Sequence, residues 1–283
     1  MCELLALSAN TPTDLRFSFH GLRLRGGATG AHADGWGLAS YDPDGHGVWL
    51  YREDAPAAFS PIAAAVAELD LKAHCSIAHI RKATRGVVAV ENCHPFHRRW
   101  ASQEWVFAHN GDLSALPPLE GQHRPIGQTD SEAAFCWILE ELERQGLNGN
   151  DEEGLFGALV GCADRLAGQG IFNGLISNGR WLFAYAGTRL HRLTRRAPFG
   201  EARLTDADLS VDFAAVTQPS DVVTIVSTEP LTTNEIWHPL EVGEAILLRG
   251  GEIVRRRDAP AAPRDEGSAG DPKEPSRTQA NHN

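Results

Sequence analysis

Apolar and polar residues alternate in two neighbouring segments of this chain, residues 36–41 and 47–53. A period of two is typical of strands that are buried on one face. The turn sequence DPDG lies between the two segments, so the pattern predicts a β-hairpin. Residues 2–8 and 75–80 are instead apolar almost throughout, which predicts buried strands.

Shorter strand candidates continue along the rest of the chain. One covers residues 104–109 and ends on the pair Asn110-Gly111. The others lie in the second half, at residues 174–177, 181–185, 190–194, 222–227, 245–248 and 253–255. Their spacing favours sheets of mainly antiparallel strands.

Helical periodicity separates these strand clusters. Residues 10–13 read as a turn, after which Thr13 or Asp14 is expected to cap a helix over 15–25. Helical spacing also predicts helices over 61–71 and 155–166, and over a segment that begins at the sequence TDSE, residues 129–132. Two groups of strands with two or more layers of helix predict an α+β sandwich.

Composition and charge narrow the class of protein. The 283 residues, 42% of them hydrophobic, suffice for one large domain or two modest ones. A formal net charge of −11 argues against a nucleic-acid-binding protein, which needs a basic face for the phosphates. No apolar run reaches the ~18 residues of a membrane span, and Glu3 does not fit a signal peptide. From residue 257 onward the composition changes to Pro, Ala, Gly, Asp and Ser, so we expect a folded domain over 2–256 and a disordered tail over 257–283.

The cysteines point to a reduced compartment. The chain has 5 of them, an odd number, and they form neither a C-x-x-C pair nor a zinc spacing. We therefore expect neither a disulfide scaffold nor a structural zinc site, and we expect a cytoplasmic enzyme. The sequence HPFH at 94–97 could suggest a metal pair, but Pro95 prevents a helical display and no third ligand accompanies it. We expect no metal ion and no cofactor.

Cys2 is the first candidate for chemistry. If an aminopeptidase removes Met1, one residue carries both a thiol and a free α-amine. An ordinary thiol has a pKa near ~8.5 and an α-amine has one near ~7.7–8, so the amine is matched to accept the thiol proton at neutral pH. The alternative is that Cys2 is a small buried apolar residue that opens a strand.

Two further stretches end predicted strands. In the sequence HIRKATRG at 79–86, Arg81 closes a buried strand, where its guanidinium could grip a carboxylate or form an internal salt bridge. In the sequence AHNGD at 108–112, Asn110 and Gly111 could form a plain hairpin turn. They could instead supply two N–H donors to an oxyanion.

A third stretch begins a predicted helix. Thr129 and Glu132 match a capping box. Asp130 has no role in a capping box, so its carboxylate could bind an ammonium group.

Taken together, these stretches resemble the class II glutamine amidotransferases. The resemblance rests on Cys2, H-x-R-x-x-T-x-G at 79–86, N-x-H-P-F at 92–96, H-N-G at 109–111 and T-D-S-E at 129–132, in this order. The opening MCELL, the DGWG segment and the TEPL segment are similar to those of YafJ-type stand-alone members of the family. The resemblance covers residues 2–256 and implies a four-layer αββα fold of the N-terminal-nucleophile hydrolase type.

The resemblance also implies a role for each candidate residue. Cys2 is expected to be the nucleophile, with its own α-amine as general base, and Asn110 and Gly111 to form the oxyanion hole. The substrate is expected to be a γ-glutamyl amide, glutamine or a larger compound. The residues expected to bind it are Arg81 at the α-carboxylate, Asp130 at the α-ammonium, and Thr84 and His94 along the pocket.

Two positions depart from the family pattern. Lys82 stands where synthetase-type members usually have Tyr or Trp, and Arg85 follows Thr84 where His is common. Both differences concern the side of the pocket that receives the leaving group. They favour hydrolysis of a γ-glutamyl amide other than glutamine.

Other functions stay open at this level. The chain could deliver ammonia to a separate synthase subunit, or it could bind a γ-glutamyl metabolite without catalysis. A papain-like cysteine hydrolase would need a local signature that the sequence lacks. Homo-oligomerisation is also left open; membrane association and nucleic-acid binding are not expected.

Overall fold

Strand β1 (Glu3–Thr13) begins directly after Cys2 and lies in the interior of a sheet, because it pairs with β4 (Ala73–Ile80) on one side and with β12 (Val222–Ser227) on the other. Both pairings are antiparallel. Leu4 and Ala6 point to one face of this sheet, and Leu5 and Leu7 to the opposite face. Both faces are covered, which explains why the sequence at this strand is apolar without alternation.

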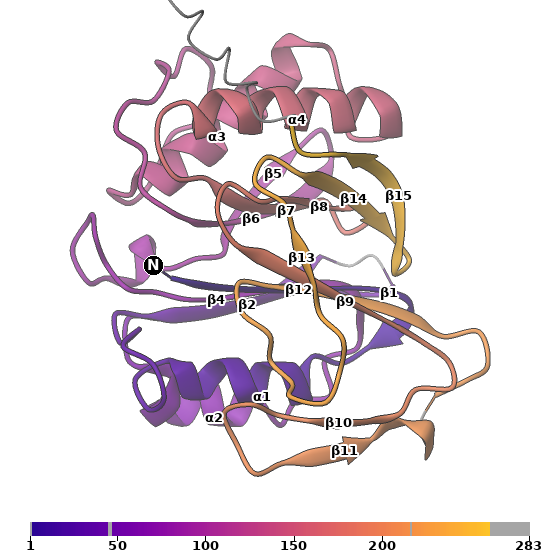
Figure 1. Ribbon diagram of the computed structural model, residues 1–283. Helices are drawn as coiled ribbons and strands as arrows, with labels where there is room; N and C mark the ends of the chain where they lie inside the picture. The colour runs from indigo at the N-terminus through magenta and orange to yellow at the C-terminus, as the bar shows by residue number, and fades with distance from the viewer. Residues whose placement is uncertain (1, 45–46, 216, 261–283) are drawn as a thin grey trace, which may run out of the picture.

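The computed structural model describes residues 2–44, 47–215 and 217–260, and in this part of the chain two sheets stack face to face (Figure 1). Within the described residues the first sheet has seven strands. Besides β1, β4 and β12, they are β2 (Trp36–Tyr41), β3 (Val48–Glu53), β9 (Leu190–Arg196) and β13 (His238–Leu240), in the order β13-β9-β12-β1-β4-β2-β3.

The second sheet, over the same described ranges, has six strands in the order β15-β14-β8-β7-β6-β5. They are β5 (Phe96–Trp100), β6 (Gln103–Asn110), β7 (Asn173–Ser177), β8 (Leu182–Tyr185), β14 (Ala245–Arg249) and β15 (Glu252–Arg257). A small two-stranded ribbon of the described chain, β10 (Glu201–Arg203) and β11 (Ser210–Asp212), lies apart from both sheets.

Helices cover the outer face of each sheet (Figure 1). Helices α1 (Arg16–Arg25) and α2 (Pro61–Val66) lie on the first sheet, and α3 (Asp130–Arg144) and α4 (Glu152–Ala167) lie on the second. Short 3-10 turns occur at η1 (Ala57–Phe59), η2 (Val90–Asn92) and η3 (Phe213–Ala215). The predicted αββα sandwich is thus confirmed.

Three apolar clusters correspond to the three interfaces between these layers. One joins the first sheet to α1 and α2, one joins the second sheet to α3 and α4, and one fills the space between the sheets. Trp36 anchors the first cluster and Trp105 the second, and both are almost completely buried. The layers therefore hold the ends of β1, β4 and β6 in fixed positions relative to one another.

Several local predictions need correction. Residues 10–13 continue strand β1 after a register shift and do not form a turn. The N-cap of α1 is Leu15 without a side-chain hydrogen bond, while Asp14 accepts a hydrogen bond from the Arg16 amide and pairs with its guanidinium. Helix α2 ends at Val66 rather than at residue 71.

The sequence pattern did not predict four of the strands, β5, β10, β11 and β13. Strand β5 joins β6 through a tight turn in which Ala101 and Ser102 have positive φ angles of 50° and 61°. Non-glycine residues rarely adopt this conformation, and no glycine signals the turn. Strand β15 ends at Arg257, one residue past the expected end of the domain, and Arg257 pairs with Asp164. Residues 261–283 of the predicted tail lie outside the described residues.

Candidate active site

The thiol of Cys2 lies where strand β1 begins and strand β4 ends. Glu3 pairs with Ile80 in the ladder, which places the sulfur beside the residues that follow β4. The backbone N–H of Lys82 donates to Cys2 Sγ at 3.2 Å, and the thiol lies 3.4 Å from the Lys82 carbonyl oxygen. The sheet register, not a local motif, therefore brings residue 2 to residue 82.

The surroundings of the thiol disfavour spontaneous ionisation. Burial raises the pKa of Cys2 above its ordinary value, and the Lys82 backbone hydrogen bond and the nearby Arg81 cation offset this only in part. A thiol of this kind needs a base to become a nucleophile at neutral pH. Met1 lies outside the described residues.

Asn110 lies at the end of β6, across from the start of β1. Its side-chain amide donates to the backbone carbonyl of Cys2, while its own Oδ1 is buried without a hydrogen-bond partner in the described chain. Strand β6 does not turn back after Asn110, since its next partner, β7, begins at residue 173. The hairpin interpretation of Asn110-Gly111 is therefore wrong.

Gly111 follows in a conformation that residues with a side chain rarely adopt. Its φ is +154°, and a Cβ atom at this position would lie 1.8 Å from the carbonyl oxygen of Ile171. Because the Cβ atom would meet backbone rather than a flexible side chain, side-chain rotation cannot relieve the overlap. Glycine is required here so that the chain can pass close to Ile171 directly after Asn110.

Arg81 is buried, but it has no acidic partner among the residues described. Its Nη1 donates to the carbonyl oxygens of Asp34 and Val87, and its Nη2 donates to those of Arg85 and Gly86, at distances between 2.9 and 3.4 Å. The internal salt bridge considered from the sequence is therefore not formed. The guanidinium organises the 85–87 loop in this structure.

Thr84 and Asp130 reach the segment after Gly111 from two sides. The hydroxyl of Thr84 donates to Asp112 Oδ1 at 2.5 Å. Asp130 Oδ2 accepts the backbone N–H of Leu113 at 2.7 Å. Both residues thus hold the 111–113 segment, and Asp112 is a member of the site that sequence reasoning missed, although it directly follows the Asn-Gly pair.

The capping prediction for α3 is confirmed in part. Thr129 Oγ1 accepts the backbone N–H of Glu132 at 3.2 Å, as an N-cap should. The carboxylate of Glu132 does not return to Thr129, since it binds the Gly127 amide and the Arg98 guanidinium instead. Helix α3 therefore begins where predicted and presents Asp130 in its first turn.

His94 is a buried histidine that packs against other rings. Its ring lies against His79 and Phe96, with centroid distances of 4.2 and 4.4 Å, and it is only 4% exposed. Burial lowers the pKa of His94 well below its ordinary value, and it lowers the pKa of His79 to about 3. Both rings are therefore neutral, and the ring nitrogens of both are buried without a hydrogen-bond partner in the described chain.

The family model for glutamine amidotransferases class-II matches residues 1–271. The Escherichia coli (strain K12) protein named "Putative glutamine amidotransferase YafJ" is 48% identical over 90% of this chain and 100% of its own length. The chain belongs to the class II glutamine amidotransferases.

Two further relatives agree with this membership. A Haemophilus influenzae protein named "Putative glutamine amidotransferase" is 43% identical over 95% of this chain and 92% of its own length. The crystal structure of a "predicted glutamine amidotransferase" from Pseudomonas aeruginosa is 42% identical, with a TM-score of 0.70 over 90% of this chain and 100% of that one.

The DGWG and TEPL segments, which the chain shares with other members of the family, contact residues next to the candidate site. Asp34 Oδ2 accepts the backbone N–H of Ala83 at 2.8 Å, which holds the loop that carries Thr84. A Cβ atom at Gly37 would lie 2.3 Å from the carbonyl oxygen of His94, so the DGWG segment needs glycine there. Thr228 exchanges hydrogen bonds with Leu4, from Leu4 N to Thr228 Oγ1 at 2.9 Å and from Thr228 N to Leu4 O at 3.1 Å.

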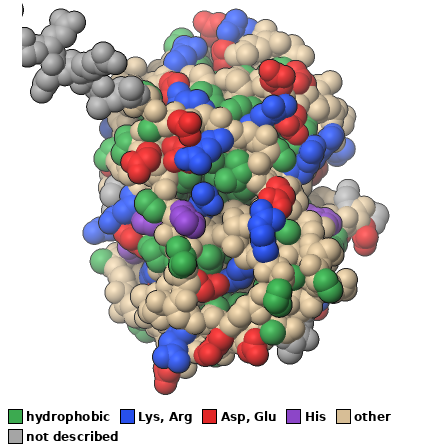
Figure 2. All heavy atoms as spheres, turned by 45° about the vertical axis from the view of Figure 1, so that its right-hand side comes forward, with side chains coloured by type: hydrophobic (Ala, Val, Ile, Leu, Met, Phe, Trp, Pro, Cys, Tyr) green, Lys and Arg blue, Asp and Glu red, His purple; other side chains and the backbone are tan. Residues whose placement is uncertain are grey.

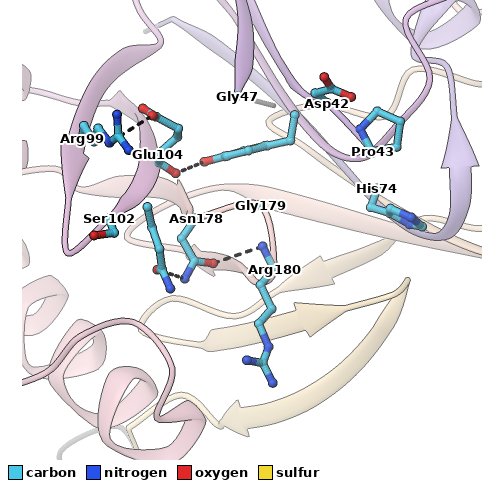
Figure 3. A pocket seen from close by; sticks show the side chains of 12 residues that line it. Asp42, Pro43, Gly47, His74, Arg99, Ser102, Glu104, Asn178, Gly179 and Arg180 are labelled. Carbon is cyan, nitrogen blue, oxygen red and sulfur yellow. Dashed lines mark hydrogen bonds and ion pairs between the residues drawn. The ribbon is translucent and has the colours of Figure 1, made fainter. Parts of the chain in front are cut away.

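The amidotransferase site does not coincide with the hollow shown in Figure 3, which has a volume of about 480 Å³. That hollow is lined by Tyr41, His74, Asn178 and Arg180 among others, and by none of the candidate site residues. Tyr41 and His74 lie at the ends of β2 and β4 that are farthest from residues 36 and 80. The hollow is therefore at the opposite end of the sandwich from Cys2.

Charges of both signs are interspersed over the face of this family member shown in Figure 2. No group of three or more His, Cys, Asp or Glu side chains is placed to hold a metal ion within residues 2–44, 47–215 and 217–260. None of the helices in those same ranges combines the length and the apolarity needed to cross a bilayer.

Proposed function

We propose that this chain hydrolyses γ-glutamyl amide bonds through a thioester on Cys2. The observation that carries the proposal is the meeting of three groups at one end of the sandwich. The thiol lies 3.2 Å from the Lys82 amide, the Asn110 side chain reaches the Cys2 backbone, and Gly111 is conformationally required beside it. These elements support a nucleophile next to an oxyanion site.

The reaction proceeds by two acyl transfers. The α-amine of Cys2, free once Met1 is removed, accepts the thiol proton, and the sulfur attacks the γ-carbonyl carbon to form a tetrahedral oxyanion. Donors at Asn110 and Gly111 stabilise that oxyanion. The carbon–nitrogen bond breaks, the proton passes to the leaving amine, and a γ-glutamyl thioester remains. Water then attacks the thioester, which releases glutamate and restores the thiol.

Arg81 and Asp130 are proposed to hold the amino-acid head of the substrate. The Nη groups of Arg81 donate to the carbonyls of residues 34 and 85–87, so binding of an α-carboxylate exchanges some of these bonds for charge-assisted ones. Each oxygen of Asp130 accepts one backbone N–H, and a carboxylate has lone pairs for further donors. An α-ammonium group can therefore add to the existing contacts.

The experiment that tests this function is intact-mass analysis of the purified protein before and after 6-diazo-5-oxo-norleucine, a glutamine analogue that alkylates such cysteines. We expect loss of Met1 and one adduct, which peptide mapping places on Cys2. The Cys2→Ser variant should lose the adduct, and a Cys93→Ser variant should keep it. A retained Met1 without an adduct would contradict the proposal and would favour a protein that binds γ-glutamyl compounds without cleaving them.

A further inference from the structure

Residues 82–85 form a bridge between the Cys2 thiol and the segment after Gly111. Lys82 contacts Cys2 Sγ with both its backbone N–H and its carbonyl. Two residues later, Thr84 binds Asp112 in the segment after the oxyanion pair. Any group that leaves from the γ-carbonyl carbon therefore departs beside this bridge.

Two side chains of this bridge are cations without a partner. Lys82 and Arg85 are exposed, and neither side chain forms a hydrogen bond or ion pair within the described part of the chain. Many arginines elsewhere have acidic partners, such as Arg195 with Glu235 and Arg196 with Glu252. Lys82 and Arg85 differ from these arginines and belong to the segment that contacts the Cys2 thiol.

The acidic residues of the site do not satisfy these cations. Asp34 accepts the Ala83 amide, Asp112 accepts the Thr84 hydroxyl, and Asp130 accepts the amides of Leu113 and Ser131. Each carboxylate thus binds neutral donors of the protein. Lys82 and Arg85 are therefore open to solvent and to an anionic group of a ligand.

We propose that Lys82 and Arg85 select γ-glutamyl substrates whose leaving amine itself carries a carboxylate, that is, γ-glutamyl amino acids or γ-glutamyl peptides. This inference rests on the proposed hydrolysis of γ-glutamyl amides. The ammonia released from glutamine has no group for these cations to bind. An amino acid on the leaving side has its carboxylate near the scissile nitrogen, and Lys82 and Arg85 carry long cationic side chains on the segment that contacts the Cys2 thiol.

The test compares substrates that differ only in that charge. Steady-state kinetics are measured on γ-glutamylglycine, on γ-glutamylglycinamide and on glutamine, with the wild-type chain and with Lys82→Gln, Arg85→Gln and the double variant. We expect kcat/KM for γ-glutamylglycine to exceed that for its neutral amide by about tenfold or more. We expect the ratio to approach one in the double variant and to fall as NaCl is added.

The ratio of kcat/KM for γ-glutamylglycine to that for its amide is taken within one variant, so a general loss of activity affects both values equally. Lys72→Gln is the matched control, because Lys72 is an exposed lysine outside the site, and its ratio should equal that of the wild-type chain. Equal kcat/KM for γ-glutamylglycine and its amide in the wild-type chain, or turnover of glutamine alone, would overturn the inference while the proposed function stands. Absence of turnover on all three substrates would instead reject the proposed function.

Discussion

The guanidinium of Arg25 lies 3.3 Å from the carboxylate of Glu3, the residue that follows Cys2. Arg25 also binds Asp206 at 2.7 Å and donates to the carbonyls of Glu229 and Pro230. Burial raises the pKa of Glu3, and the Arg25 cation opposes this rise. One buried cation thus ties the start of β1 to two loops from the last third of the chain.

Replacement of Arg25 by Gln is expected to leave two buried acids without their cation. Loss of one partner of a buried pair costs about 3–5 kcal/mol, so Arg25→Gln should lower the free energy of unfolding by an amount of that order. Glu3→Gln should cost less, because Asp206 still faces Arg25. Urea denaturation followed by circular dichroism measures both.

The control for this pair is Arg16→Gln, which removes a cation that is 45% exposed and bound to Asp14. Exposed pairs contribute little, so its unfolding midpoint should match that of the wild-type chain. Equal effects of Arg25→Gln and Arg16→Gln would contradict the role given to Arg25.

Asn110→Ala removes the side-chain amide that reaches the Cys2 backbone. Loss of one oxyanion donor typically lowers kcat about 10²–10³-fold, and we expect that loss with little change in KM. Steady-state kinetics on the best γ-glutamyl substrate check it, with thermal melting to show that the fold is retained. A variant with wild-type kcat would remove Asn110 from the oxyanion site.

Gly111→Ala introduces a Cβ atom 1.8 Å from the carbonyl oxygen of Ile171. The segment must shift to relieve this overlap, so we expect both a lower melting temperature and a large loss of kcat. The control is Gly157→Ala, in the interior of α4, where a Cβ atom meets nothing within 4 Å. That variant should be about 0.5–1 kcal/mol more stable than the wild-type chain, since Ala favours a helix. If Gly157→Ala lowered the melting temperature and Gly111→Ala did not, the steric requirement for glycine at position 111 would be contradicted.

The buried His79–His94 pair makes stability depend on pH. Burial lowers the pKa of His79 from 6.5 to about 3, with His109 and Arg81 adding to the effect. Below pH 6.5 the unfolded chain therefore takes up a proton that the folded chain refuses. Stability is complete above that pH and falls as the pH drops toward 3, by about 1.4 kcal/mol per pH unit for each such histidine.

His79→Gln removes one of these titrations. The slope of unfolding free energy against pH, measured by urea denaturation between about pH 4 and 6, should be shallower in the variant by one proton. Carboxylates contribute equally to both proteins, so the difference isolates the histidine. Identical slopes would show that His79 is protonated in the folded chain.

Hydrophobic periodicity predicted most strands of the two main sheets. It failed where contacts with distant segments determine the local conformation. The hairpin of β2 and β3 and the strands β4, β6 and β12 lie within a residue or two of their predicted limits. Residues 10–13 look like a turn by composition, yet they extend β1, because Asn10 bonds the backbone at Ser220 and Val222 of a distant segment. Strand β13 has three residues and, within the described part of the chain, pairs with β9 alone, so no local pattern predicts it.

The candidate site divides in the same way. Motif order pointed to Cys2, Asn110, Gly111 and Thr84, and the structure gathers all four at one end of the sandwich. The partners of these residues could not be predicted. Asp112 and Asp34 enter the site only through the register of the strands and the path of the loops.

By itself, the sequence determined the layers of this protein, its family and the residue types at the site, because periodicity and short motifs are local properties of the chain. Only the tertiary structure decided that the Arg81 guanidinium faces backbone carbonyls, that His94 is packed against His79, and that Lys82 flanks the thiol of Cys2. Each of these contacts joins residues at least four positions apart, and the contact of Lys82 with Cys2 spans 80 positions. Their geometry follows from strand register and layer packing, which no local pattern specifies.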